Sequence, residues 1–385
     1  MLSEVAYVSR RMRFVVLVCV CTSSLYAQDL AGIAIHGFVT QGFLFSSHNN
    51  YLTAQSGSGS LQWTDGAISV SDSLTDSLRV GIQLHMYQLG QLGGPNIQVD
   101  WASGDYRLND RFGIRAGKVK TVIGLFNDSQ DVDTLFLWTL LPQCSYPLDN
   151  KSFYLAHTGG DVYGDLPLGN RAGSLRYDGY AGQVTFDLNG GYLKALVDEG
   201  FVFTTAPGGK SYGGDVRWMT PLRGLTVGSS ATVETVAGSA PGVSVLVPSF
   251  LKKEYYAQFA KGKFYFAGEY DRSPANAFVT FGPVTIPVPQ DLRSWFAMAS
   301  YRMTKNLHVG SYYSHYVNKA LDTVLPANYS KDFVLSGRSD FNSYFYGKIE
   351  AHFLHGTAVG YYESTNLRGL KPNSTMLAAK IGFSF

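Results

Sequence analysis

Apolar and polar residues alternate in short segments from residue 33 to the end of the chain. Strict alternation is typical of a β-strand whose two faces meet different surroundings. The clearest segment sets Leu78, Val80, Ile82, Leu84 and Met86 on one face, against Ser77, Arg79, Gln83 and His85 on the other. Similar patterns predict sixteen strands, near residues 33–46, 61–71, 77–89, 95–104, 111–120, 172–182, 184–196, 211–219, 224–236, 252–260, 263–272, 293–303, 307–317, 339–349, 352–363 and 374–385.

The connections between these segments differ in length in a regular way. Those after even-numbered strands are short, whereas the odd-numbered ones include 47–60, 121–171, 197–210, 237–251, 273–292, 318–338 and 364–373. A soluble β-sandwich also alternates, but short turns at one end and long loops at the other favour an outer-membrane barrel. We therefore predict an all-β fold, a single transmembrane antiparallel β-barrel of about sixteen strands over residues 28–385. A barrel of that size leaves an aqueous channel.

Composition agrees with this fold class. Charged residues make up 16% of the 385 residues, below the ~25% of ordinary soluble domains, while aromatics reach 14% and glycines number 42. The mean hydropathy is -0.02, and no second long apolar run follows the first 27 residues, which excludes a bundle of membrane helices. A chain rich in aromatics and almost neutral is not expected to be disordered.

The N-terminus predicts export. Arg10, Arg11 and Arg13 precede an apolar run over residues 14–21, and Ala27 offers a small residue for cleavage, so residues 1–27 read as a signal peptide. Its removal takes three arginines and Glu4 from 31 basic and 29 acidic residues, which leaves 28 of each. A neutral chain argues against a nucleic-acid partner. Cys144 is then the only cysteine, so no internal disulfide can form.

Several motifs resemble one porin group. The stretch 115–120 (RAGKVK), followed by 124–128 (GLFND) and Asp131, resembles the phosphate-selective porin O/P-like group, as do 141–147 and 157–164. The resemblance is strongest over residues 111–182. It implies a sixteen-stranded barrel, usually a homotrimer, that passes small hydrophilic solutes or ions, phosphate or other anions among them, across the bacterial outer membrane.

The chain also departs from that group. Val122 and Ile123 stand where a proline is expected, and the lysine cluster tied to phosphate selectivity is not evident. These departures leave the solute open. The terminal Phe385, with apolar residues at alternate positions before it, is similar to the assembly signal read by the barrel assembly machinery. Outer-membrane lipid and lipopolysaccharide are the other expected partners.

The connection 121–171 is the third on the long-loop side, where general porins fold a loop into the lumen. Loops of this length are usually functional or disordered. Between residues 121 and 170 it carries one base and six acids, and residues 132–141 contain an apolar run that would suit one helix packed on the wall. We predict a constriction loop that carries Asp128, Asp131 and Asp133. The alternative is an extracellular loop whose acids meet water or divalent cations at the lipopolysaccharide surface.

The polar strand faces predict the lining of the channel. A transverse field between the loop acids and lumenal arginines would select solutes by size and charge. A bland alternative is that charges are merely tolerated in the lumen, because a base facing lipid costs ~2–4 kcal/mol. The candidate pore-lining residues are Arg79, His85, Asp100, Arg115, Arg176, Asp178, Asp215, Arg217, Glu269 and Asp271.

The sequence offers little support for a catalytic function. The eight histidines are scattered, and HExxH, CxxC and GxSxG do not occur. We therefore predict a passive channel, not an enzyme, with no cofactor or metal. Two alternatives remain: a secreted, soluble β-rich protein that binds carbohydrate, and an outer-membrane barrel used for adhesion or as an anchored hydrolase.

Overall fold

The computed structural model describes residues 32–52, 55–90, 92–188 and 205–385, together with residues 190, 193, 197, 200, 202 and 203. The predicted signal peptide, residues 1–27, lies outside the described residues. Within the described ranges, no helix has both the length and the apolar character that a membrane crossing demands.

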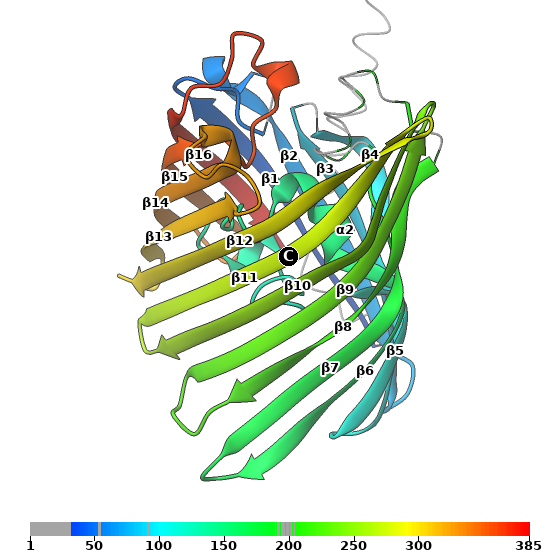
Figure 1. The fold of residues 1–385 in the computed structure, drawn as a ribbon. Helices are drawn as coiled ribbons and strands as arrows, with labels where there is room; N and C mark the ends of the chain where they lie inside the picture. Colours follow the sequence, from blue (N-terminus) through cyan, green and yellow to red (C-terminus); the bar gives the residue numbers. More distant parts are fainter. Residues whose placement is uncertain are drawn as a thin grey trace, which may run out of the picture.

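The described strands form one closed antiparallel barrel of sixteen members, in which each strand pairs with its neighbours in sequence and β1 pairs with β16 (Figure 1). The predicted fold class is confirmed. The strands are β1 (Ile33–Ser46), β2 (Ser60–Ser73), β3 (Leu78–Leu89), β4 (Leu92–Asn109), β5 (Phe112–Lys120), β6 (Ala156–Gly169), β7 (Gly173–Thr185), β8 (Thr205–Met219), β9 (Leu225–Ala240), β10 (Val243–Lys261), β11 (Phe264–Phe281), β12 (Val284–Arg302), β13 (Leu307–Asn318), β14 (Tyr329–Asp340), β15 (Phe345–Gly356) and β16 (Asn373–Ser384). The described connections also contain the α-helix α2 (Lys151–Leu155) and short 3-10 helices at Ser56–Ser58, Asp133–Leu135, Leu148–Asn150, Pro326–Asn328 and Glu363–Thr365.

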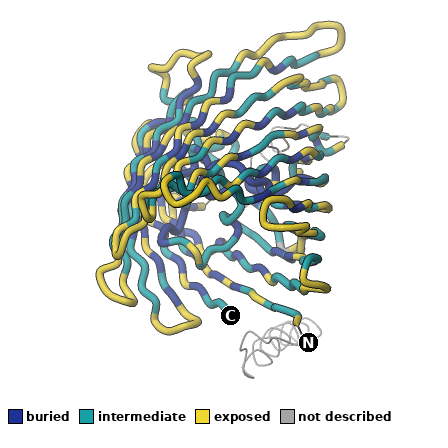
Figure 2. Tube along the Cα trace, turned by 90° about the horizontal axis from the view of Figure 1, so that it is seen from below, coloured by how far each residue is buried: buried dark blue, intermediate teal, exposed yellow. Residues whose placement is uncertain are grey.

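The barrel is apolar outside and polar inside. On β11, Phe264 and Phe266 are exposed, whereas Glu269 and Asp271 are buried. Figure 2 shows the resulting alternation of buried and exposed residues along the strands. A soluble β-sandwich buries its apolar faces, so this distribution is the inverse of the one that the soluble alternative requires.

Trp101 departs from the predicted face. The sequence pattern groups it with the outward-facing Ile97 and Val99, but the β3–β4 register passes from Gln83↔Trp101 to Leu84↔Val99, which leaves Asp100 as an extra residue. A bulge of this kind re-aims the following side chain. Trp101 therefore shares the lumenal side of Gln83, and Lys120 Nζ lies 5.6 Å from the centroid of its ring.

The predicted strand count is right, although two of its parts are wrong. The sequence places residues 156–169 in a loop and divides the next segment into strands at 172–182 and 184–196. In the structure the first segment is β6, and β7 runs without a break from Gly173 to Thr185. Residues 189, 191, 192 and 194–196 of the second predicted strand lie outside the described residues. Glycine-rich β6 has no apolar alternation, because close packing fills its faces: a Cβ at Gly159 would lie 2.1 Å from the Ala181 carbonyl oxygen.

Two predicted long loops are strands. The stretches 237–251 and 273–292 continue β9–β10 and β11–β12 as tall hairpins, whose tips lie at the upper right of Figure 1. Their connections are Pro241-Gly242 and Gly282-Pro283. Gly242 and Gly282 have φ values of 80° and 55°, which suit tight hairpin turns and disfavour other residues.

The next loop on this side of the barrel, between β13 and β14, is also shorter than predicted. The sequence pattern places a loop at 318–338 and strands at 339–349 and 352–363, but β14 and β15 begin at Tyr329 and Phe345. The chain turns between them at residues 341–344, where the Asn342 side chain accepts hydrogen bonds from the backbone amides of Tyr344 and Phe345. An asparagine that bonds its own backbone in this way stabilises a turn.

Two rows of outward-facing residues cross β10, β11 and β12. The aromatic row is Tyr255, Tyr270 and Trp295, which are paired in register. One step closer to the hairpin tips is the basic row, Lys253, Arg272 and Arg293, also paired in register. Asp291 holds both arginines of this row, with Nε of Arg272 at 2.9 Å and Nη2 of Arg293 at 2.6 Å. The outer surface therefore changes from apolar to charged at one level of these strands.

The C-terminal residue closes the seam between β1 and β16. The Phe385 amide donates to the Gly37 carbonyl oxygen at 3.0 Å, and the Gly37 amide donates to the Phe385 carbonyl oxygen at 3.1 Å. The Phe385 ring covers the Cα of Gly37, where an added Cβ would lie 2.8 Å from ring atom Cζ.

We expect Gly37→Val to lower the stability of the barrel by ~1–3 kcal/mol, because overpacking forces the Phe385 ring or the strand to move. The readout is the temperature at which the heat-dependent gel mobility of the folded barrel is lost. Gly104→Val is the matched control, since no heavy atom lies within 4 Å of a Cβ added there. Equal melting temperatures for the two variants would contradict the seating of Phe385 on Gly37.

Candidate functional site

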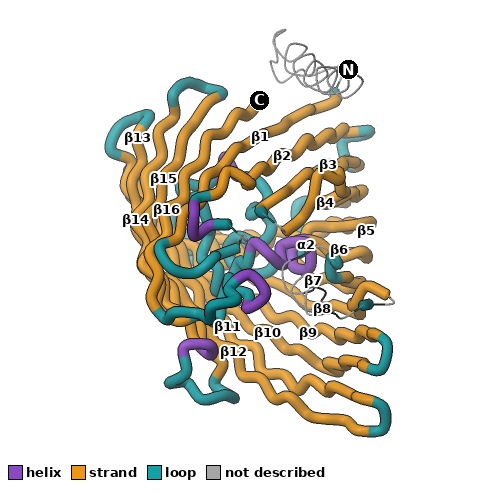
Figure 3. The backbone as a smooth tube through the Cα atoms, turned by 90° about the horizontal axis from the view of Figure 1, so that it is seen from above, coloured by secondary structure: helices purple, strands orange, loops and turns teal. Residues whose placement is uncertain are grey.

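The connection between β5 and β6, residues 121–155, runs through the inside of the barrel and is called the inward loop below. Figure 3 shows it, with α2, in the middle of the ring of strands. The predicted inward fold is confirmed, although β6 ends the loop at residue 155 instead of 171. Its side chains and amides bond to lumenal groups on β3 and β16 and, across the barrel, on β11.

An apolar cluster holds one side of the inward loop to the wall. Leu125, Phe126, Leu137, Trp138 and Tyr146 pack with residues of β10 to β14, among them Tyr256, Phe296, Tyr312 and Val334. Trp138 stands edge-on to Tyr312 with ring centroids 5.2 Å apart. The helix expected within 132–141 is absent from the described structure: this stretch contains only the 3-10 turn Asp133–Leu135. Packing against the wall replaces helical hydrogen bonds here.

Asp133 is the main ionic anchor of the inward loop. Its carboxylate lies 2.9 Å from Lys348 Nζ and 2.7 Å from Lys380 Nζ, and it accepts a hydrogen bond from Tyr346 at 2.7 Å. Burial acts to raise the pKa of Asp133, but the two lysines outweigh it and hold that pKa below its ordinary value. The carboxylate therefore stays ionised, and the contact persists, well below neutral pH.

Backbone groups of the inward loop are bonded to charged lumenal side chains nearby. Arg338 Nη1 donates to the carbonyl oxygens of Thr134 and Phe136 at 2.6 and 2.9 Å. Glu350 accepts from the amides of Thr139 and Leu140 at 2.7 and 2.9 Å. Because an unpaired backbone group inside the barrel would be costly, these bonds fix the path of the loop.

The other two predicted constriction residues also reach the wall. Asp131 lies 2.7 Å from Lys120 Nζ and accepts a 2.7 Å hydrogen bond from Gln83. Asp128 lies 3.5 Å from Arg217 Nη1. The three loop acids are thus brought into the lumen, but only Asp128 meets one of the predicted arginines. The sequence analysis expected the loop acids and the lumenal arginines to face each other across the channel. Asp128 and Arg217 instead form a direct ion pair.

The predicted lining residues on β3 to β8 form compact clusters. His85 lies 2.6 Å from Asp65 and 3.3 Å from Asp100. Arg115 lies between Asp178, at 3.0 Å, and Asp105, at 3.3 Å. On β8, Asp215 pairs with Arg217 at 2.9 Å. The members of these clusters lie on the polar, inward-facing side of the strands, where they neutralise one another.

Two predicted arginines are more open to solvent. Arg176 pairs with Asp165 at 2.9 Å, yet its side chain is 54% exposed. Arg79 is also exposed and donates to the hydroxyl of Ser71 at 2.9 Å, and among the described residues it makes no ion pair. Neither arginine contacts an acid of the inward loop in that part of the chain. They are the lumenal charges that a dissolved ion meets with least compensation.

The last two predicted lining residues, Glu269 and Asp271, are buried against the base of the inward loop. Glu269 accepts from the Leu125 amide and the Tyr146 hydroxyl, both at 2.6 Å. Asp271 accepts from the Ser145 hydroxyl at 2.5 Å. These acids hold the loop instead of lining open space.

A cavity of about 410 Å³ remains between the inward loop and the wall. It is lined by Gln83, Ser69 and His36 on one side and by Val132 and Thr134 of the loop on another. Ser343 and Tyr344 of the β14–β15 turn and the C-terminal Phe385 line it as well, so the cavity lies toward the end of the barrel that carries the short turns.

Sequence reasoning missed the lysines that hold Asp133. Lys348 lies on β15, whose boundaries were predicted wrongly. With the correct boundaries, Lys348, Glu350 and His352 fall at alternate positions on one polar face, and this pattern would have predicted that Lys348 faces the lumen. Lys380 lies on the last predicted strand, but its partner Asp133 lies 247 residues away. Both lysines are paired with Asp133, and the strands that carry them lie far in sequence from the porin-like motifs.

Comparison with known proteins identifies the fold. No family model and no curated protein matches the sequence. Among solved structures, the chain superposes on Salmonella typhi OmpF in complex with daunomycin with a TM-score of 0.59, at 11% identity, over 92% of this chain and 97% of OmpF. The likeness is one of fold. An anion-selective porin from Comamonas acidovorans gives 0.57 at 11% identity, covering 92% and 99%. The trimer form of OmpT from Vibrio cholerae gives 0.53 at 10% identity, covering 92% and 99%.

We expect Asp133→Asn to loosen the inward loop, since Lys348 and Lys380, with side chains 0% and 4% exposed, would lose their counter-charge. Breaking a buried ion pair costs ~3–5 kcal/mol. Hydrogen exchange at the amides of residues 132–140 should become faster in the folded barrel. Asp110→Asn is the control, because Asp110 is 89% exposed in a turn and pairs only with exposed Arg107. Unchanged exchange in Asp133→Asn would show that apolar packing alone holds the loop.

Proposed function

We propose that this chain is an outer-membrane porin, a passive water-filled channel for small hydrophilic solutes or ions. The observation that carries the proposal is the inverted barrel: apolar side chains outside, charged side chains inside, and a loop that narrows the lumen. Only a closed sheet satisfies all its backbone groups in lipid, so a barrel with this outer face suits a membrane. The proposal includes no catalytic step and no cofactor.

The rows on the outer surface support a membrane position. Aromatic girdles mark the interfaces of outer-membrane barrels, and the aromatic row lies directly beside the basic row. At the other end of the same strands, Phe264 packs on Tyr301 with ring centroids 4.8 Å apart. Residues 264–270 of β11 thus lie between the two aromatic levels, and the basic row follows directly at Arg272.

We propose a homotrimer and assembly by the barrel assembly machinery. OmpT of Vibrio cholerae, similar in fold, has been solved in a trimer form. The terminal Phe385, which closes the β1–β16 seam, matches the type of C-terminal residue expected of an assembly signal. Cleavage of residues 1–27 before assembly belongs to the same proposal.

We propose that selectivity is set where Arg79, Arg176 and Asp128 face the lumen. These charges are more open to solvent than the buried clusters, and one neighbour in fold is an anion-selective porin. Exposed arginines without full compensation favour anions, phosphate among them, because a confined lumen focuses the field of its charges. The ion pair between Asp128 and Arg217 reduces this anion preference, because Asp128 neutralises the charge of Arg217.

We expect Arg79→Gln and Arg176→Gln to shift the reversal potential toward cation preference, and Asp128→Asn to shift it toward anion preference by freeing Arg217. In a tenfold salt gradient each shift should be a fraction of the ~59 mV of ideal selectivity. Purified protein in planar bilayers gives the measurement, with chloride and then with phosphate. Arg293→Gln, which changes an outward-facing base, should leave the potential unchanged. Equal potentials in all variants would reject these residues as selectivity elements, and absence of conductance would reject the porin.

The basic row is proposed to bind the phosphates of lipopolysaccharide. We expect the triple variant Lys253→Gln, Arg272→Gln, Arg293→Gln to weaken lipopolysaccharide binding at least tenfold, since each cation contributes ~1 kcal/mol near an anionic surface. Binding of purified lipopolysaccharide to the detergent-solubilised barrel gives the affinity. The triple variant Lys261→Gln, Lys263→Gln, Arg302→Gln, at the opposite ends of the same strands, is the control. Equal losses in both variants would contradict a site at the basic row.

A further inference from the structure

Three buried carboxylates meet on the lumenal face of β10 and β11. Glu254 is paired in register with Asp271, and Glu269 precedes Asp271 by two residues on the same face. Their exposed fractions are 1%, 3% and 4% for Glu254, Asp271 and Glu269. Like charges directly opposite each other on a sheet are destabilising, and burial makes their repulsion stronger. The group therefore needs a compensating charge.

The neighbouring cation compensates only part of this charge. Lys252 Nζ forms an ion pair with Oε1 of Glu254. Within the described part of the chain, Glu269 and Asp271 accept hydrogen bonds from hydroxyls and an amide, which carry no formal charge. One lysine against three carboxylates leaves an excess of two negative charges when all are ionised. A divalent cation would balance that excess.

The oxygens of these carboxylates divide into two kinds. Oε2 of Glu269 and Oδ2 of Asp271 accept hydrogen bonds from the inward loop. Among described atoms, Oε2 of Glu254, Oε1 of Glu269 and Oδ1 of Asp271 are buried without a hydrogen-bond partner. Buried polar atoms are almost always paired. In metal sites, a ligating carboxylate is commonly held in place by hydrogen bonds to one of its oxygens, so that its other oxygen points at the metal.

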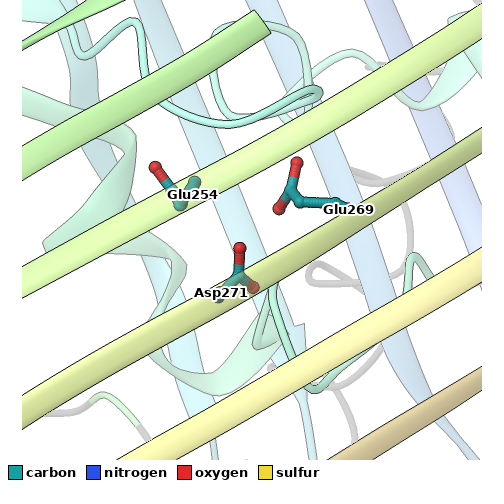
Figure 4. Close-up of side chains that lie close together, drawn as sticks. All are labelled: Glu254, Glu269 and Asp271. Carbon is teal, nitrogen blue, oxygen red and sulfur yellow. The ribbon is translucent and has the colours of Figure 1, made fainter.

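The geometry fits a single ion. One carboxylate oxygen from each residue can be chosen so that all three lie within 4.8 Å of one another, and Figure 4 shows the three carboxylate ends gathered between β10 and β11. Two oxygens on opposite sides of a Ca²⁺ ion are ~4.8 Å apart, twice the ~2.4 Å Ca–O distance. The set holds oxygen ligands only, which suits a hard cation and disfavours Zn²⁺, whose sites use nitrogen and sulfur.

We propose that Glu254, Glu269 and Asp271 bind one Ca²⁺ ion, which fastens the base of the inward loop to the wall. The loop reaches the site through the Leu125 amide, Ser145 and Tyr146, each bonded to one of the ligating carboxylates. Water and the hydroxyls nearby supply the remaining ligands, since Ca²⁺ takes six to eight oxygens. The inference concerns binding and loop position, and it does not depend on the chain being a porin.

The test is a calcium titration of the folded barrel. Protein refolded in detergent from inclusion bodies, free of lipopolysaccharide, is treated with chelator and titrated with Ca²⁺ by calorimetry. We expect one saturable site per chain. Glu254→Gln should lower the affinity at least tenfold, and it leaves the loop untouched because its oxygens make no contact with the loop in the described structure. The matched control Glu234→Gln removes a buried carboxylate on β9, bonded to Ser211, and should leave the affinity unchanged.

Luminescence provides a second readout at the same site. Tb³⁺, which replaces Ca²⁺ in oxygen sites, should be sensitised by Tyr146, whose hydroxyl lies 2.6 Å from Glu269. Tyr146→Phe should reduce the Ca²⁺-displaceable luminescence severalfold. If Glu254→Gln does not fold, Asp271→Asn takes its place, and the wild-type titration alone decides whether a site exists. Absence of saturable Ca²⁺ binding in the wild type, or equal affinity in the wild type and Asp271→Asn, would overturn the proposal. Equal affinity for Mg²⁺ would overturn the choice of Ca²⁺.

Discussion

The demand that every backbone polar group be bonded within the sheet governs this molecule. A closed ladder from β1 to β16 meets it and leaves two surfaces of opposite character. Since the outer one is given mainly to apolar side chains, most of the charge carried by the strands faces a small interior. Charged side chains therefore lie close together inside the barrel, and the inward loop packs among them.

Crowding explains why the loop is held so firmly. Its acids supply counter-charges to bases of the wall, as Asp133 does for Lys348 and Lys380, and its amides supply donors to wall acids such as Glu350. Burying the charged groups of the loop or of the wall without their partners would cost free energy. The loop and the wall thus stabilise each other. The space open to solutes is the part of the lumen that the loop does not occupy.

The sequence predicted the barrel, the strand number and the inward course of the third long loop, because alternation and connection length report directly on a two-faced closed sheet. It failed where that signal weakens. Glycine-rich β6 shows no alternation, and the hairpins β9–β10 and β11–β12 rise beyond the apolar belt, so they resemble loops. Asp131 and Asp133 bond to lysines of the wall, but those partners, Lys120 for Asp131 and Lys348 and Lys380 for Asp133, depend on register between segments that are distant in the sequence. Local pattern does not encode that register.

Cys144 gives the molecule a built-in reporter. It is the only cysteine after residue 27, it lies in the inward loop, and its Sγ is 3.8 Å from the Trp295 carbonyl oxygen on β12. Burial raises the pKa of this thiol to about 12, so the reactive thiolate is scarce at neutral pH while the loop is packed. Alkylation by a thiol reagent would then measure how often the loop leaves the wall, in the native chain and with no engineered label.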